Sequence, residues 1–141
     1  MKPRIFTLDE TTQIAKMLNA EAKHSHIFLF HGEMGSGKTT LIKSMCRQLG
    51  VNEHTSSPTF AIVNTYQGTQ HIIYHFDLFR LRDVHELEAI GFSEYVDSGN
   101  MLFIEWPEQA LPLLKGYEVV KIVLETIDTE HRRISMQIET L

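Results

Sequence analysis

The sequence predicts an α/β fold, a three-layer sandwich around a mixed, partly parallel sheet. Short apolar runs typical of buried strands are separated by helical segments, which predicts parallel strands joined by helical crossovers. Other strand-like runs lie on either side of a glycine turn, which predicts antiparallel hairpins. Because both kinds of connection occur in one chain, we expect the sheet to be mixed.

The elements of the N-terminal half follow from apolar spacing and helix-end signals. Residues 2–7 are predicted to form a short strand, and residues 9–23 a helix, because Ile14, Met17 and Leu18 recur at helical spacing. Residues 27–30 are a compact apolar run that predicts a fully buried strand. A helix is expected over residues 39–49, ending at Gly50.

The C-terminal half is predicted to be mostly strands, with one further helix. Residues 56–59 are expected to be a loop, and the runs on either side of Gly68 are expected to pair as a hairpin. The strands are predicted over residues 60–63 (continued by 66–69), 71–76, 101–104, 119–127 and 134–138, and the helix over residues 84–90.

Length and composition indicate one cytoplasmic domain, residues 1–141. The 141 residues suffice for a single core, and no apolar run approaches the ~20 residues of a membrane helix. One cysteine, Cys46, permits no intramolecular disulfide, which fits a reducing cytoplasm. Thirteen basic residues against eighteen acidic ones give a charge of −5. Because nucleic-acid affinity depends on basic residues, DNA and a long tRNA footprint on this chain alone are disfavoured.

A phosphate-binding loop is the strongest motif in the chain. Residues 32–39, Gly-Glu-Met-Gly-Ser-Gly-Lys-Thr, fit G-x-x-x-x-G-K-[ST], with a predicted strand before them and a helix after. The glycines let the backbone wrap a phosphate, and the helix N-terminus adds its positive dipole end. Lys38 can reach the β- and γ-phosphates, and the Thr39 hydroxyl can ligate Mg²⁺. The fold class is therefore refined to a P-loop NTPase-like sandwich.

Two acidic residues at strand ends could complete a metal and water-activating site. Glu105 directly follows residues 101–104, and Asp77 follows residues 71–76. Each could instead be an ordinary solvated acid, but two beside a P-loop favour a functional role for at least one. The chain lacks D-x-x-G after Asp77 and N-K-x-D anywhere, so ATP/ADP is favoured over guanine nucleotides. Lys38, Asp77 and Glu105 are thus the candidate catalytic residues.

Three further blocks, together with the P-loop, carry a family resemblance. They are Ser57-Pro58-Thr59, residues 75–81 (His-Phe-Asp-Leu-Phe-Arg-Leu) and residues 105–108 (Glu-Trp-Pro-Glu). In this order they resemble the bacterial TsaE (YjeE) ATPases of tRNA threonylcarbamoyladenosine synthesis, over residues 27–108. Phe79 stands where Tyr is common in that family and Ser36 where Ala is common, and neither change removes a needed group.

The resemblance implies a role for each matching residue. Asp77 would lie near the γ-phosphate, orienting water or sensing its loss, and Ser57-Pro58-Thr59 would be a switch-like loop. Trp106 would stand near the nucleotide or a partner. Mg²⁺ would be held by Thr39 and Glu105. The phosphates would be held by Gly35, Ser36, Gly37, Lys38, Thr39 and Thr40.

The same resemblance implies partners and a task. Such a protein would act with TsaB and TsaD, which transfer the threonylcarbamoyl group to adenosine 37 of tRNA. Its ATP hydrolysis, slow alone and stimulated by the partners, would reset that pair between turnovers, and it would meet tRNA mainly through the complex.

Several alternatives stay open at this level. A small-molecule P-loop kinase would share the phosphate loop, and a regulatory module would bind nucleotide without turnover. Arg80 and Arg82 could act as arginine fingers, although solvated arginines are the default interpretation. His24 and His26 are spaced closely enough to suggest a metal, but surface histidines are the commoner case.

Overall fold

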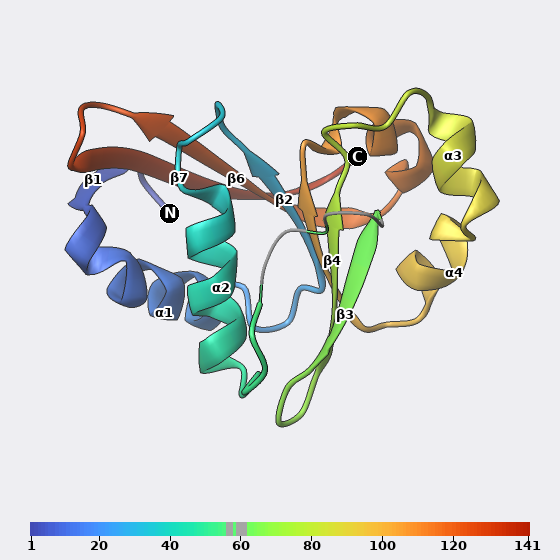
Figure 1. Ribbon diagram of the computed structural model, residues 1–141, viewed down its shortest axis with the longest axis horizontal. Helices are drawn as coiled ribbons and strands as arrows, with labels where there is room; N and C mark the ends of the chain where they lie inside the picture. The colour runs from blue at the N-terminus through green and yellow to red at the C-terminus, as the bar shows by residue number, and fades with distance from the viewer. Residues whose placement is uncertain (56–57, 59–61) are drawn as a thin grey trace.

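The computed structural model describes residues 1–55, 58 and 62–141 (Figure 1). These residues form one seven-stranded sheet in the order β1-β7-β6-β2-β5-β4-β3. The strands are β1 (Arg4–Thr7), β2 (Ile27–His31), β3 (Val63–Gln67), β4 (Ile72–Asp77), β5 (Met101–Glu105), β6 (Glu118–Thr126) and β7 (His131–Thr140). The helices are η1 (Leu8–Glu10), α1 (Thr11–Glu21), α2 (Lys38–Gln48), α3 (Val84–Ala89), α4 (Phe92–Asp97) and η2 (Pro107–Leu114), where η marks a 3₁₀ helix.

The centre of the sheet is parallel and its two sides are antiparallel. Strand β2 pairs in parallel with β5 and β6, and β4 pairs in parallel with β5. The hairpins β3–β4 and β6–β7, together with β1 on β7, are antiparallel. The carboxyl ends of β2, β4 and β5 therefore meet at one edge, where ligand sites of open α/β sheets form. The predicted mixed, partly parallel sheet is confirmed.

Helices cover both faces of the sheet, which makes the three predicted layers (Figure 1). Side chains of β2 alternate between them: Phe28 and Phe30 pack in the cluster with α1 and α2, whereas Ile27 and Leu29 pack in the cluster with α3, α4 and η2. Because every one of these four side chains is buried, the strand is apolar on both faces, as expected of a central parallel strand.

The structure corrects several predicted boundaries. The helix expected over residues 9–23 starts one residue earlier, as η1, because Thr7 and Glu10 form a capping box there. It continues as α1, which ends at Glu21. Helices α4 and η2 were not predicted. A left-handed Gly91 separates α4 from α3, and η2 is a 3₁₀ helix with Pro112 inside it, so neither shows long helical periodicity.

The predicted hairpin around Gly68 is confirmed over its described residues. The described part of its first strand is Val63–Gln67, which pairs antiparallel with β4. Residues 60 and 61 of the predicted strand, and Ser57 and Thr59 of the expected switch-like loop, lie outside the described residues. Strand β7 is longer than predicted because its two ends pair with β1 and with the start of β6.

Candidate nucleotide-binding site

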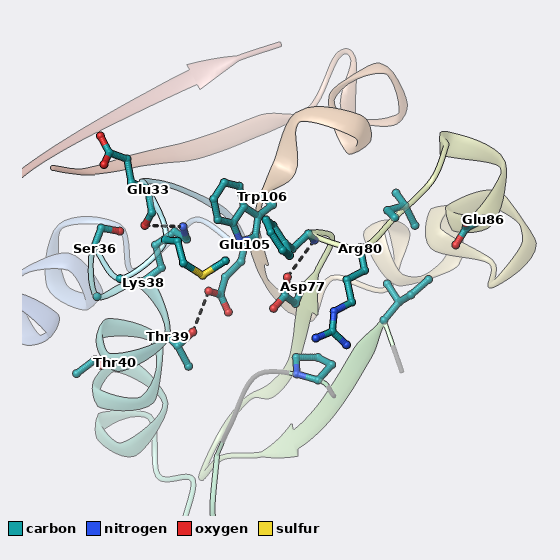
Figure 2. Close-up of a pocket in the computed structure, with 17 residues that line it drawn as sticks. Glu33, Ser36, Lys38, Thr39, Thr40, Asp77, Arg80, Glu86, Glu105 and Trp106 are labelled. Atoms are coloured by element: carbon teal, nitrogen blue, oxygen red, sulfur yellow. Dashed lines mark hydrogen bonds between the residues drawn. The ribbon is translucent and has the colours of Figure 1, made fainter. Parts of the chain in front are cut away.

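A cleft of about 670 Å³ lies at the carboxyl edge of the sheet (Figure 2). The loop after β2, the first turn of α2 and the ends of β4 and β5 all contribute to it. Its lining includes the residues that the motifs and the resemblance assigned to phosphates, Mg²⁺ or catalysis: Gly35, Ser36, Gly37, Lys38, Thr39, Thr40, Asp77 and Glu105. Pro58, Arg80 and Trp106 line it as well. The structure thus brings together residues as far apart in sequence as Gly35 and Trp106.

The backbone of the loop needs glycine at two positions. Gly35 and Gly37 have φ of 81° and 102°, in the left-handed region that side chains with a Cβ rarely adopt. Gly37 is also the residue immediately before α2, so the loop leads straight into a helix N-terminus. The aligned N–H groups and the helix dipole there favour an anion such as a phosphate.

Lys38 lies at the centre of the cleft and is only 5% exposed. Its Nζ donates to the carbonyl oxygens of Gly32 and Glu33, the latter at 3.3 Å. Nζ also lies 3.7 Å from the centroid of the Trp106 ring, a cation–π contact. Burial lowers the pKa of Lys38, while the nearby carboxylates of Glu105 and Asp77 act in the opposite direction. An anion that binds in the cleft would therefore meet a Lys38 ammonium group that water solvates poorly.

Trp106 is held over Lys38 by an unusual backbone. Its φ of 55° and ψ of 58° place it in the left-handed region, the only such non-glycine residue among those described. This conformation costs free energy for a bulky residue and is commonest at functional sites. The ring packs against exposed Phe79, with centroids 4.9 Å apart. The two aromatic rings form one wall of the cleft.

Glu105 is buried between α2 and the neighbouring strand β4. The Thr39 hydroxyl donates to Glu105 Oε1 at 2.9 Å (Figure 2). On the other side, His75 Nε2 lies 2.7 Å from Glu105 Oε2. Nδ1 of His75 is buried and meets no hydrogen-bond partner among the described residues, so the tautomer that fits is the one whose Nε2–H donates to Glu105. The carboxylate is thus oriented from two sides.

The oxygens of Thr39 and Glu105 suit a hard divalent cation. Mg²⁺ prefers oxygen ligands and usually takes only one or two protein groups, the rest being water and phosphate oxygens. Within the described part of the chain, no group of three or more His, Cys, Asp and Glu residues could hold a metal ion. One hydroxyl and one carboxylate at 2.9 Å fit Mg²⁺ bound together with a nucleotide.

Asp77 ends β4 beside Glu105, its partner in the parallel register. Its Oδ1 accepts the backbone N–H of Phe79 at 3.0 Å, and the side chain faces the cleft in Figure 2. Burial raises the pKa of Asp77, with the negative charge of Glu105 acting in the same direction. Two carboxylates, from the ends of β4 and β5, thus line the same cleft as Lys38.

The raised pKa of Asp77 leads to a prediction about stability. A carboxyl whose pKa is higher in the folded chain is stabilising when protonated, and that contribution is lost as pH rises through its folded pKa. Ionised Asp77 is therefore destabilising at neutral pH. We expect Asp77→Asn, which keeps the acceptor for Phe79, to have a higher Tm than the parent at pH 7, by thermal denaturation. The difference should vanish below the reference pKa of 3.8. An equal gain at pH 3 and pH 7 would contradict the prediction.

Two residues of this region were not predicted. His75 lies two positions before Asp77, so it shares a strand face with Asp77, and that spacing could have identified it. Arg132, in β7, donates to the carbonyls of Ser36 and Gly35. No sequence pattern connects it with the loop. Of the two arginines considered after Asp77, Arg80 lines the cleft and Arg82 is not among its described lining residues.

The fold and the phosphate loop together define a P-loop NTPase-like nucleotide-binding protein. Residues 5–134 match the family described as "Threonylcarbamoyl adenosine biosynthesis protein TsaE". The chain belongs to this TsaE family, which confirms the resemblance seen in its motifs.

Individual relatives agree with the family assignment. A TsaE of Rickettsia felis is 36% identical over 132 residues, covering 91% of this chain and 74% of the relative. A TsaE of Bacillus subtilis is 33% identical over 138 residues, covering 96% and 84%. The crystal structure of Bacillus subtilis YdiB superposes with a TM-score of 0.70 at 24% identity, covering 96% of this chain and 84% of that one. This last likeness supports the fold. Among the described residues, no helix is both long and apolar enough to cross a membrane.

Proposed function

We propose that this protein binds and hydrolyses ATP with Mg²⁺ in tRNA threonylcarbamoyladenosine synthesis, and that hydrolysis resets the TsaB–TsaD transferase between turnovers. The observation that carries the proposal is the meeting of Lys38, Thr39 and Glu105 in one cleft behind a glycine loop. Membership of the TsaE family supports the pathway, since its relatives are named for threonylcarbamoyladenosine biosynthesis.

The residues divide the chemistry among them. Backbone N–H groups from Gly35 to Thr40 receive the phosphates, and Lys38 contacts the β- and γ-phosphates. Thr39 and Glu105 hold Mg²⁺, which neutralises phosphate charge when bound. The oxygen of a water attacks the γ-phosphorus while the bond from that phosphorus to the β–γ bridging oxygen breaks, yielding ADP and phosphate with release of a proton. Asp77, which lines the same cleft, orients this water or senses the loss of phosphate.

The burial of Lys38 favours phosphate binding over solvation. An ammonium group exposed to water is strongly hydrated, and the high dielectric constant of water weakens its attraction to a phosphate. The Lys38 amine is instead surrounded by carbonyl oxygens and an aromatic ring, where a charge-assisted hydrogen bond to phosphate is stronger.

The proposal is tested by following threonylcarbamoyladenosine on tRNA with the TsaB–TsaD pair of the same organism. The reaction is run over many turnovers with this protein, without it, and with Lys38→Ala. Turnover sustained only by the parent protein with ATP supports the proposal. If an active reaction is unchanged by the protein, the assigned pathway is wrong. A screen of small phosphate acceptors would then test the kinase alternative.

His75 provides a separate prediction about the metal. If its Nε2–H orients Glu105, then His75→Ala should weaken Mg²⁺-dependent nucleotide binding by roughly 10-fold to 100-fold, the usual cost of losing a residue that orients a metal ligand. His75→Gln places an amide N–H near the same position and should restore most of the loss. Calorimetric titration of ADP with and without Mg²⁺ measures both effects. Equal weakening in the two variants, or equal weakening without Mg²⁺, would contradict this role.

A further inference from the structure

Arg132 is a buried arginine whose hydrogen bonds to the described residues all go to main-chain carbonyl oxygens. Its Nε donates to the carbonyl of Ser36 at 3.0 Å and Nη2 to that of Gly35 at 3.3 Å, both in the phosphate loop. Nη1 donates to the carbonyls of Asp128 at 2.7 Å and His131 at 3.0 Å. The side chain is 9% exposed. One guanidinium therefore links the β6–β7 turn to a loop that lies 96 positions earlier in the sequence.

The charge of Arg132 has no carboxylate partner within ion-pair distance among the described residues. Burying an arginine without a counter-ion is costly, and hydrogen bonds to carbonyl dipoles offset only part of that cost. Arginine is suited to this position because its planar fork offers several N–H donors in fixed directions at once. An apolar side chain would fill the same space without this cost, so packing does not explain why an arginine is buried here. Its hydrogen bonds to the phosphate loop are the alternative explanation.

The geometry of the peptide unit supplies that reason. In a trans peptide, the carbonyl and the following N–H point in opposite directions, and the described chain contains no cis peptide. Because the carbonyl of Ser36 points to Arg132, the N–H of Gly37 points away from it. Ser36 and Gly37 line the cleft, whereas Arg132 is not among the described residues that line it. Arg132 thus holds the loop from outside the cleft, with the Gly37 N–H directed away from the guanidinium.

We propose that Arg132 is the positioning residue of the phosphate loop: its fork fixes the Gly35 and Ser36 carbonyls so that the loop is already shaped for the phosphates of a nucleoside di- or triphosphate. This inference rests on the proposed function, because it assumes that the loop binds nucleotide phosphates. It adds that the loop is held by β7, a strand that is not adjacent to β2 in the sheet. Its positive charge also adds to the field at the loop.

The neighbouring Arg133 is a matched control. It stands one position along the same strand and pairs with Glu125 at 3.3 Å, with both side chains exposed. An exposed pair of this kind contributes little to stability. Arg133→Met therefore removes the same charge and the same side chain without touching the loop.

The test compares ADP and inorganic pyrophosphate binding by the full chain and by Arg132→Met, Arg132→Lys and Arg133→Met, using calorimetric titration with Mg²⁺. We expect Arg132→Met to bind ADP roughly 10-fold to 100-fold more weakly, the scale of losses from small misplacements of binding groups. Pyrophosphate affinity should fall in parallel, because the effect is on the phosphates. Arg132→Lys keeps the charge but not the fork, so it should stay weak, and Arg133→Met should bind like the parent.

The outcomes separate positioning from simple structural support. A variant that only destabilises the fold loses binding stoichiometry and Tm while its Kd stays that of the parent, whereas a positioning defect raises Kd at full stoichiometry. Equal Kd values for Arg132→Met and Arg133→Met, or parent affinity in Arg132→Lys, would overturn the inference. If Arg132→Met does not fold, Arg132→Lys alone decides. If the parent itself binds neither ligand, the proposed function fails, and this inference with it.

Discussion

Lys38→Ala is expected to abolish nucleotide-dependent function while leaving the fold intact. The substitution removes the one cationic group that the cleft presents from the phosphate loop, at the position where charge develops on the γ-phosphate during hydrolysis. Removing a single group that stabilises such charge typically lowers kcat by about 10²–10³. Release of phosphate from ATP, measured with and without the TsaB–TsaD pair, should therefore fall to background.

Stability should change little in the same variant. Burial lowers the pKa of Lys38, which means that the folded chain disfavours its charged form relative to the unfolded chain. Deleting the amine thus removes an unfavourable charge together with its bonds to the Gly32 and Glu33 carbonyls. We expect a Tm close to that of the parent, which would show that lost activity is not lost folding.

Lys43→Ala is the matched control for this experiment. Lys43 lies on the same helix, α2, but lines a different cavity, near Arg47 and His54. The Lys43→Ala variant should hydrolyse ATP at the parent rate. A folded Lys38→Ala protein with full activity would end the P-loop argument, and equal losses in both variants would show that general charge on α2 matters rather than the loop lysine.

The sequence could predict this site because its main parts are local. A glycine loop between an apolar strand and a helix is one continuous segment, so residues 32–40 can be recognised from the local sequence. Asp77 and Glu105 were also predictable, since each ends an apolar strand and the carboxyl ends of parallel strands share one edge. Their exact pairing in register required the sheet order, which the sequence does not state.

The parts that were missed depend on long-range geometry. Arg132 reaches the loop from β7, which is two strands away from β2 in the sheet. Nothing in the sequence around it distinguishes Arg132 from the exposed Arg133 beside it. His75 was hidden by the apolar run around it, although its spacing from Asp77 placed it on the cleft face. The left-handed backbone of Trp106 is likewise a tertiary effect, because no local preference of tryptophan favours it.

Glu105→Gln is expected to weaken the binding of ADP with Mg²⁺ roughly 10-fold to 100-fold and to leave binding without Mg²⁺ nearly unchanged. The carboxylate supplies the negative charge that a hard cation needs, whereas a neutral amide attracts it poorly. Glutamine is preferred to alanine here because Glu105 is 2% exposed and is bonded to Thr39 and His75. Alanine would leave these buried polar groups unpaired and confuse metal loss with destabilisation.

Glu108→Gln is the matched control for Glu105→Gln, because it removes a carboxylate only three positions further along the chain. Its carboxylate is exposed and pairs with His31 at 3.7 Å, and it is not among the described residues of the cleft. Titrations of ADP in Mg²⁺ and in a chelator give a metal-dependent ratio of affinities for each protein. That ratio should fall only in Glu105→Gln, because only this variant loses a charge beside the Thr39 hydroxyl. If both affinities fell equally, Glu105 would shape the pocket rather than hold the metal, and Asp77 would become the acid to test at the cation.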